Sequence, residues 1–242
     1  MKLPNMIKLY PLWQITNNLP MKHKLIFALF LLPLFVEAQN IAALPVEVKN
    51  KAAAKRIVFY LSGDGGMNTF SQKLVEELSA KNYALVSLDS RKYFWEQKSP
   101  EQLEQDLSAL ISHYLKSWDK DEFSIVGYSF GADAALLLAP RLSKDLQSKL
   151  KSLVLLSPST STDLVVKLTD MIGFGSKTAK YKTTSEIPKI NSPMLFIFGA
   201  DEESDAYKVI PDRKNIVKTL IPGSHKFNND MKKVSTTVIN GL

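Results

Sequence analysis

One serine of this chain lies between two glycines, at the junction of a predicted strand and a predicted helix. The motif Gly127-Tyr128-Ser129-Phe130-Gly131 follows an apolar, β-branched run and precedes a helix-forming run. In a nucleophile elbow, glycines at these positions leave room for the neighbouring strand and helix, and the serine oxygen projects from a sharp turn beside a helix N-terminus. The motif therefore predicts that Ser129 is the nucleophile of a hydrolase. A glycine-rich loop that matches by chance would lack the strand and the helix.

A nucleophilic serine needs a general base, and histidines are few in this chain. Of the three, His23 lies near the N-terminus and His113 lies inside a predicted helix upstream of Ser129. His225 follows Pro222-Gly223-Ser224 in the loop that leaves the last predicted strand. In the α/β-hydrolase fold the triad follows the chain order serine, acid, histidine. We therefore predict that His225 is the base, against the alternative of a surface loop histidine.

The acid that orients this base should follow the strand before the last one. An acidic cluster stands there, after Gly199, and consists of Asp201, Glu202, Glu203 and Asp205. The usual spacing in this fold places the acid three residues after the glycine. This spacing favours Glu202, with Asp201 second and Asp205 third.

Two backbone N–H groups should stabilise the oxyanion that forms on the substrate. One is predicted to be that of Phe130, directly after the nucleophile. The other should come from the turn after the first buried strand, Ser62-Gly63-Asp64-Gly65-Gly66, with Asp64 or Gly65 as the donor. This turn lacks the Lys-Ser/Thr ending of a phosphate-binding P-loop.

Three side chains are candidates for binding the substrate. Asp64 either braces its own turn by accepting backbone N–H groups or binds a cationic group of the substrate. Asp133 lies in the first turn of the helix after Ser129, where the helix dipole favours a carboxylate whatever its function. Tyr93, in Tyr93-Phe94-Trp95, either packs as a satellite core or lines a rim that contacts lipid.

The elements that must position these residues alternate along the chain. Short apolar runs predict buried strands at Arg56–Leu61, Tyr83–Leu88, Phe123–Gly127, Lys151–Leu156, Met194–Phe198 and Ile216–Ile221. Apolar periodicity predicts helices at 68–81, 100–118, 132–141 and 229–240, and Val46–Val48 fits a short edge strand. This alternation predicts an α/β-hydrolase fold, with a mainly parallel sheet of about six strands and helices on both faces. The long segment 157–192 is a candidate cap over the site.

The N-terminal part of the chain resembles an export signal rather than part of a fold. Basic residues at 22–24 precede an apolar run, 25–36, and a small-residue cleavage site that ends at Ala38. We therefore expect a signal peptide at 21–38, a periplasmic protein and a single domain at 39–242. Residues 1–20 are interpreted as an upstream extension, with translation starting at Met21. A retained membrane anchor is the alternative.

Composition excludes several classes of function. The 242 residues include no cysteine, so no disulfide or thiolate metal site can form, and the serine chemistry requires no metal or other cofactor. Cleavage after Ala38 lowers the net charge from +7 to +4, because it removes four lysines and one glutamate. The remaining lysines are scattered and lack interleaved aromatic residues, so they predict a solvated surface, with no nucleic-acid partner. Transient contact with an anionic membrane surface remains open.

Several motifs follow one another along nearly the whole mature chain: Leu61-Ser62-Gly63-Asp64-Gly65-Gly66, Asp89-Ser90-Arg91-Lys92-Tyr93-Phe94-Trp95, Ser99-Pro100-Glu101, Gly127-Tyr128-Ser129-Phe130-Gly131-Ala132-Asp133 and Pro222-Gly223-Ser224-His225-Lys226-Phe227. Together these motifs resemble one known family, the bacterial virulence protein VirJ family, which includes the AcvB proteins. Two positions differ from the usual family pattern. Met67 replaces a tryptophan and Lys226 replaces a second histidine, both near the mouth of the predicted site.

The resemblance implies a periplasmic α/β-hydrolase domain that cleaves the aminoacyl ester of lysyl-phosphatidylglycerol, with a link to type IV secretion and its proteins. A lysyl group would need a carboxylate, for which Asp64 and Asp133 are available. Two rival interpretations remain. One is a non-catalytic periplasmic accessory or binding protein for secretion on a hydrolase scaffold, since fold alone does not fix function. The other is a general carboxylesterase or lipase with a different acyl preference.

Overall fold

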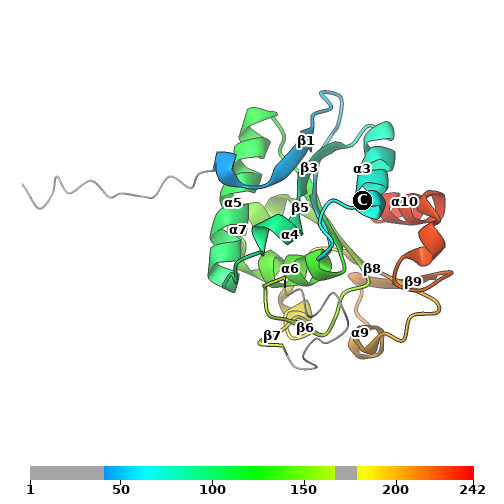
Figure 1. Cartoon of the computed structure of the whole chain (residues 1–242). Helices are drawn as coiled ribbons and strands as arrows, with labels where there is room; N and C mark the ends of the chain where they lie inside the picture. The colour runs from blue at the N-terminus through cyan, green and yellow to red at the C-terminus, as the bar shows by residue number, and fades with distance from the viewer. Residues whose placement is uncertain (1–40, 167–178) are drawn as a thin grey trace, which may run out of the picture. The chain divides into compact units, whose positions relative to one another are not determined.

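The predicted buried strands lie together in one sheet of the computed structural model, which describes residues 41–166 and 179–242 (Figure 1). Its seven strands are β1 (Val46–Lys49), β2 (Ile57–Leu61), β3 (Ala84–Leu88), β4 (Phe123–Tyr128), β5 (Leu150–Leu156), β8 (Met194–Gly199) and β9 (Ile216–Ile221). Their order is β1-β3-β2-β4-β5-β8-β9, and only β1 runs antiparallel to its neighbour. The sheet exceeds the predicted six strands because the polar edge strand β1 pairs with β3.

Helices connect the strands, and side chains at their first turns mark where several of them begin. The helices are α3 (Thr69–Ala80), α4 (Ser90–Tyr93), α5 (Pro100–Ser117), α6 (Phe130–Leu138), α7 (Lys144–Lys149), α9 (Asp205–Val209) and α10 (Met231–Asn240). The Asn68 side chain accepts from the N–H of Ser71 at the start of α3, and Ser99 and Gln102 form a capping box before α5. Each such cap contributes about 1 kcal/mol to helix stability.

Both faces of the sheet are covered because its central strands are apolar on both sides. In β2, Ile57, Phe59 and Leu61 face a core shared with α5 and α6. Val58 and Tyr60 face the opposite core, shared with α3 and α10. This alternation follows from the two-residue period of a strand, and burial on both faces is typical of parallel sheets.

The strand order changes direction at the centre of the sheet. The chain runs from β2 outward to β3 and then returns to β4 on the other side of β2. At such a switch point the loops that leave the two neighbouring strands diverge, and the crevice between them is the usual ligand site of open α/β sheets. Here these loops begin at Ser62 and at Ser129, so the topology brings the predicted oxyanion turn beside the predicted nucleophile.

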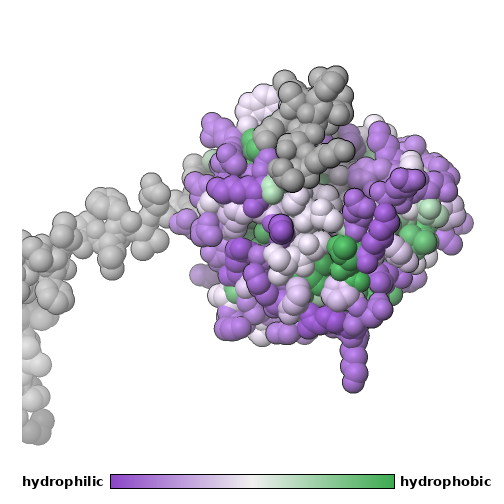
Figure 2. Space-filling model, turned by 90° about the horizontal axis from the view of Figure 1, so that it is seen from below, coloured by the Kyte–Doolittle hydropathy of each residue, from purple (hydrophilic) through white to green (hydrophobic). Residues whose placement is uncertain are grey.

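The segment proposed as a cap is only partly described. It contains a two-stranded sheet of β6 (Ser161–Thr162) and β7 (Tyr181–Lys182) and the 3₁₀ turn η3 (Ile187–Lys189). Residues 167–178 of the segment, the predicted signal peptide at 21–38 and the predicted extension at 1–20 lie outside the described residues. Within the described part of the chain, no helix is long and apolar enough to cross a bilayer. The face on the side of α9 and β6 is mainly hydrophilic, with small hydrophobic patches (Figure 2).

Candidate active site

Ser129 has a backbone conformation that residues other than glycine rarely adopt. Its φ is 53° and its ψ is −119°, between the end of β4 and the first residue of α6. Its N–H donates to the carbonyl oxygen of Leu156 at 2.8 Å, which fixes the turn against the neighbouring strand β5. Such a conformation costs about 1–3 kcal/mol and persists only where the surroundings enforce it. The serine therefore has the strained geometry of a nucleophile elbow.

The two glycines of the motif are required by close backbone contacts. A Cβ atom on Gly127 would lie 2.5 Å from the Cα of Ala132, at the start of α6. A Cβ on Gly131 would lie 2.1 Å from the carbonyl oxygen of Leu61, at the end of β2. Any other residue at either position would push α6 away from the sheet.

His225 and Glu202 extend a chain of hydrogen bonds from Ser129. The Nε2 atom of His225 lies 2.9 Å from the Oγ of Ser129, and its Nδ1 atom lies 2.8 Å from the Oε1 of Glu202. The three side chains follow β4, β9 and β8, and β5 and β8 lie between β4 and β9 in the sheet. The arrangement is that of a Ser-His-acid triad, in which the acid holds the imidazole in one tautomer and orientation.

A tight loop brings His225 back from β9 toward β4. Gly223 has a φ of +104°, and Phe227 and Asn228 have φ values of 52° and 53°. The ring of Phe227 is fully buried and lies 6.2 Å from that of Phe70, which anchors the loop on α3. These left-handed residues curl the loop and keep His225 at the edge that carries Ser129.

The acid-bearing turn and the base-bearing loop are joined through their backbones. The N–H of Asp201 donates to the carbonyl oxygen of Gly223 at 2.9 Å, and the N–H of Ala200 donates to that of Ile221 at 2.7 Å. A Cβ on Gly199 would lie 2.3 Å from the carbonyl oxygen of Ser224. The positions of acid and base are therefore set together by these shared backbone contacts.

Glu202 is held at both of its oxygens. Its Oε1 faces His225, and its Oε2 accepts from the Oγ of Ser157 at 2.7 Å and from the N–H of Gly199 at 3.3 Å. Burial raises the pKa of Glu202, but the hydrogen bonds from His225, Ser157 and Gly199 outweigh burial and lower it below its ordinary value. The carboxylate therefore stays charged at neutral pH.

The other acids of the cluster lie away from the imidazole. Asp201 is exposed, and the contact described for it is made by its backbone. Glu203 is exposed as well. Asp205 begins α9 and pairs with Lys208 at 3.1 Å. Of the candidates that the sequence left open, the structure brings only Glu202 to His225.

Sequence reasoning missed two residues that touch this constellation. Ser157, directly after β5, has a φ of 45° and donates to Glu202. Tyr128 lies with its ring 5.5 Å from that of His225, and its hydroxyl donates to the carbonyl oxygen of His225 at 3.3 Å. Burial, with the nearby charges of Asp64 and Glu202, raises the pKa of Tyr128. A signal for both was available, because Tyr128 ends β4 and Ser157 directly follows β5, at the edge of the sheet that carries the site.

The predicted oxyanion turn lies against Ser129. A Cβ on Gly63 would lie 3.5 Å from the Cβ of Ser129, and the N–H of Gly66 donates to the carbonyl oxygen of Gly63 at 2.9 Å. This bond closes a turn around Asp64 and Gly65, whose N–H groups have no acceptor among the described residues. The N–H of Phe130, at the first position of α6, has no intrahelical acceptor either. Within the described residues, the N–H groups of all three predicted donors therefore have no acceptor and are free to donate.

Asp133 and Tyr93, which the sequence offered as substrate-binding candidates, are buried and make hydrogen bonds within the fold. Asp133 is only 3% exposed, and its oxygens accept from the N–H of Ser159 at 2.7 Å and from the Ser159 hydroxyl. Tyr93 is buried and donates to Asp106 at 2.7 Å. Asp133 therefore ties α6 to the loop after β5, and Tyr93 ties α4 to α5. Asp64 is partly exposed, and within the described residues its carboxylate has no hydrogen-bond or ion-pair partner.

No cluster of metal ligands accompanies these residues. Among the residues that the structure describes, no group of three or more histidine, cysteine or acidic side chains has an arrangement that would hold a metal ion. The groups that meet at the site are a hydroxyl, an imidazole, a carboxylate and backbone N–H donors. Such a set carries out acyl transfer through a covalent serine intermediate.

The fold is that of an α/β hydrolase, as comparison with solved structures shows. Est1E from Butyrivibrio proteoclasticus matches with a TM-score of 0.60 and 15% identity, over 81% of this chain and 90% of that chain. A lipase-esterase related protein from Clostridium acetobutylicum matches with a TM-score of 0.62 and 15% identity, over 82% and 99%. An esterase from Pyrococcus furiosus matches with a TM-score of 0.56 and 14% identity, over 79% of this chain and 82% of that chain. At these identities the likeness concerns the fold.

The family is shown by the sequence itself. The model of the family described as bacterial virulence protein (VirJ) matches residues 55–242, which is most of the chain. The chain therefore belongs to the VirJ family, as its motifs predicted. A search of the curated proteins found no matching sequence.

Proposed function

We propose that this protein is an exported serine esterase that cleaves a carboxylic ester. The observation that carries the proposal is the unbroken chain of hydrogen bonds from Ser129 through His225 to Glu202. A surface histidine with no catalytic role is not expected to lie between a strained serine and a carboxylate whose two oxygens both accept hydrogen bonds. The esterase-like fold and the family membership agree with the proposal.

In the proposed mechanism the hydroxyl of Ser129 attacks the ester carbonyl while Nε2 of His225 takes its proton. Glu202, charged at neutral pH, stabilises the imidazolium that forms. The N–H of Phe130 and that of Asp64 or Gly65 donate to the oxyanion. His225 then returns the proton to the leaving alcohol. Water, activated by the same imidazole, hydrolyses the acyl-serine and restores the free hydroxyl.

We propose the aminoacyl ester of lysyl-phosphatidylglycerol as the substrate, on two grounds. The first is the likeness to the VirJ family that the motifs carry. The second is the carboxylate of Asp64, which lies in the turn against Ser129 and has no partner among the described residues. A lysyl ammonium would supply that partner. Export through the segment 21–38, action at the periplasmic membrane surface and contact with secretion proteins complete the proposal.

The decisive experiment compares Ser129→Ala with Ser148→Ala, a control at an exposed serine of α7. Release of lysine from lysyl-phosphatidylglycerol in detergent micelles should fall at least about 10³-fold in Ser129→Ala, because the nucleophile is lost. It should be unchanged in the control. Lysine release that persists in Ser129→Ala would refute the mechanism.

A fluorophosphonate probe separates the rival interpretations. Labelling that depends on Ser129 is expected for an active esterase. An unreactive wild-type protein would favour a non-catalytic accessory of secretion. Labelling without lysine release would indicate an esterase with another acyl preference, and a panel of simple esters would then define it.

A further inference from the structure

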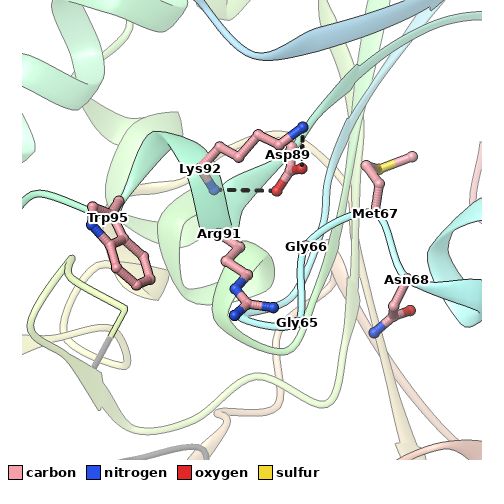
Figure 3. A pocket seen from close by; sticks show the side chains of 8 residues that line it. All are labelled: Gly65, Gly66, Met67, Asn68, Asp89, Arg91, Lys92 and Trp95. Atoms are coloured by element: carbon pink, nitrogen blue, oxygen red, sulfur yellow. Dashed lines mark hydrogen bonds and ion pairs between the residues drawn. The ribbon is translucent and has the colours of Figure 1, made fainter. Parts of the chain in front are cut away.

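A cavity of about 520 Å³ lies next to the predicted oxyanion turn, residues 62–66, here called the active-site turn. The proposed mechanism does not use this cavity. One wall is formed by Gly65 and Gly66, and the opposite wall by four residues that follow β3, namely Asp89, Arg91, Lys92 and Trp95 (Figure 3). Since β3 is the neighbour of β2, the segments that leave these strands meet at the edge of the sheet that carries Ser129. The turn 63–66 thus faces Ser129 through Gly63 and this cavity through Gly65 and Gly66.

The conformation of Gly66 keeps the two walls close together. Its φ is +67°, and a Cβ there would lie 2.6 Å from the Oδ1 of Asp89 and 3.1 Å from the Cβ of Arg91. Any other residue would be strained and would also push Arg91 away. Ser62 adds a second tie, because its Oγ accepts from the N–H of Ser90 at 2.9 Å. The position of Arg91 relative to the active-site turn is therefore fixed by the backbone.

The cavity carries an unneutralised positive charge. The side chain of Arg91 extends toward Gly65, and within residues 41–166 and 179–242 its guanidinium makes no hydrogen bond or ion pair (Figure 3). Lys92 is largely exposed and reaches Asp89 only at 3.4 Å. With one carboxylate against two cations, the lining has a net positive charge and attracts an anion.

An aromatic side chain lies beside these cations. Trp95 lines the same cavity and remains 55% exposed, although it follows the fully buried Phe94. An exposed indole is apolar on its faces and has one N–H donor, so it suits a ligand that is part organic and part polar. The combination of a free guanidinium, an ammonium and an indole fits an anionic group attached to a carbon chain.

We propose that this cavity binds a phosphate group of the ester substrate. The planar guanidinium of Arg91 would donate two parallel hydrogen bonds to phosphate oxygens, and Lys92 would contact a third oxygen. Trp95 would pack against the adjoining organic part. The inference rests on the proposed function, since it places the phosphate on the far side of the oxyanion turn from the ester.

The first test measures the preference for a phosphate-bearing ester. The readout is the ratio of kcat/KM for lysyl-phosphatidylglycerol to kcat/KM for lysine ethyl ester, which has the same acyl group and no phosphate. Arg91→Gln should lower this ratio about tenfold or more, because a charged hydrogen-bonding partner is lost. Arg91→Lys should recover only part of it, since an ammonium cannot form the bidentate pair.

Lys73→Gln is the matched control, because it removes one positive charge from an exposed site on α3. An unchanged ratio in Lys73→Gln with a lowered ratio in Arg91→Gln supports the subsite. Equal losses in both variants would mean general attraction of the protein to anionic lipid and would overturn it. An unchanged ratio in Arg91→Gln would overturn it too. If the wild type hydrolyses neither ester, the proposed function fails, and the second test still judges the subsite.

The second test measures binding in Ser129→Ala without any chemistry. Titration with sn-glycerol 1-phosphate should change the tryptophan fluorescence, whereas glycerol should not. The change should be lost in Trp95→Phe and weakened at least about tenfold in Arg91→Gln. Binding of inorganic phosphate but not of glycerol phosphate would identify a site for the free ion and would overturn the inference. Binding of glycerol phosphate would support a headgroup site. No saturable change with either phosphate would overturn the inference.

Discussion

Glu202 and Asp133 each accept a hydrogen bond from a serine that follows β5, and these serines, Ser157 and Ser159, are two residues apart. Their surroundings differ. Glu202 is partly exposed and has three donors, from Ser157, Gly199 and His225. Asp133 is buried, and both hydrogen bonds described for it come from Ser159. The two pKa values consequently move in opposite directions.

The difference shows that a carboxylate–serine contact does not by itself define a role. For Glu202 the donors outweigh burial, so the pKa falls and the charge is kept. For Asp133 burial outweighs the donors from Ser159 and raises the pKa to about 7. One carboxylate can therefore stabilise an imidazolium at neutral pH. The other ties α6 to the loop after β5 and titrates near neutrality.

Glu202→Gln is the strongest test of this contrast. A neutral amide cannot stabilise the imidazolium, and its NH₂ group would favour the wrong tautomer of His225. We expect kcat for ester hydrolysis to fall by about 10³- to 10⁴-fold, the size of the loss when a triad acid becomes an amide. Steady-state kinetics would measure the loss, and Glu203→Gln, at an exposed neighbour, is the control. A loss below tenfold would show that Glu202 is not the acid of the triad.

Asp133→Asn tests the other carboxylate through the pH dependence of stability. Between its unfolded pKa near 3.8 and its folded pKa of about 7, Asp133 is protonated in the folded state and charged in the unfolded state. The folded protein therefore binds more protons, and the free energy of unfolding falls as pH rises from about 4 to about 7, by up to about 1.4 kcal/mol per pH unit.

The Asn variant lacks this contribution and should gain stability relative to the wild type as pH rises through that window. Urea unfolding at several pH values would measure the difference. Asp121→Asn, at an exposed position, should give a curve parallel to the wild type. A parallel curve for Asp133→Asn would contradict the raised pKa.

The smallest expected effects come from exchanging the two serines for alanine. Ser157→Ala removes one of the three donors of Glu202 and should lower kcat about fivefold, the equivalent of one hydrogen bond of about 1 kcal/mol. Ser159→Ala should leave kcat unchanged and lower the free energy of unfolding by about 1–3 kcal/mol, because a buried polar group loses a partner. Kinetics and urea unfolding of both variants would reveal whether the two roles are separate. A lowered kcat in Ser159→Ala with an unchanged kcat in Ser157→Ala would contradict these two roles.

Most of the sheet was predictable, because strands of a parallel sheet are buried on both faces and form short apolar runs. The predicted bounds of β2, β3, β4, β5, β8 and β9 agree with the observed ones to within one residue. The helices α4, α7 and α9 were missed because each has only four to six residues, too few for an apolar period. The edge strand β1 gave a weak signal because it is not buried.

The candidate site was predictable where the chain order of the fold limits the choice, as for Ser129 and His225. It was not predictable where a role depends on a distant partner. Tyr93 is occupied by Asp106 and Asp133 by Ser159, and neither pairing follows from local sequence. Arg91 had no separate signal either, because an arginine between two predicted elements is usually solvated. Only the fold shows that its guanidinium lines a cavity and has no partner among the described residues.

The shared backbone contact between the turn after β8 and the loop after β9 has an evolutionary consequence. Ala200 is bonded to the last residue of β9, Asp201 is bonded to the loop, and Gly199 packs against Ser224. An inserted or deleted residue in either segment would therefore displace acid and base together. Homologous chains should therefore differ in length elsewhere, as between β5 and β8. Loops elsewhere can then change while the arrangement of Ser129, His225 and Glu202 is inherited intact.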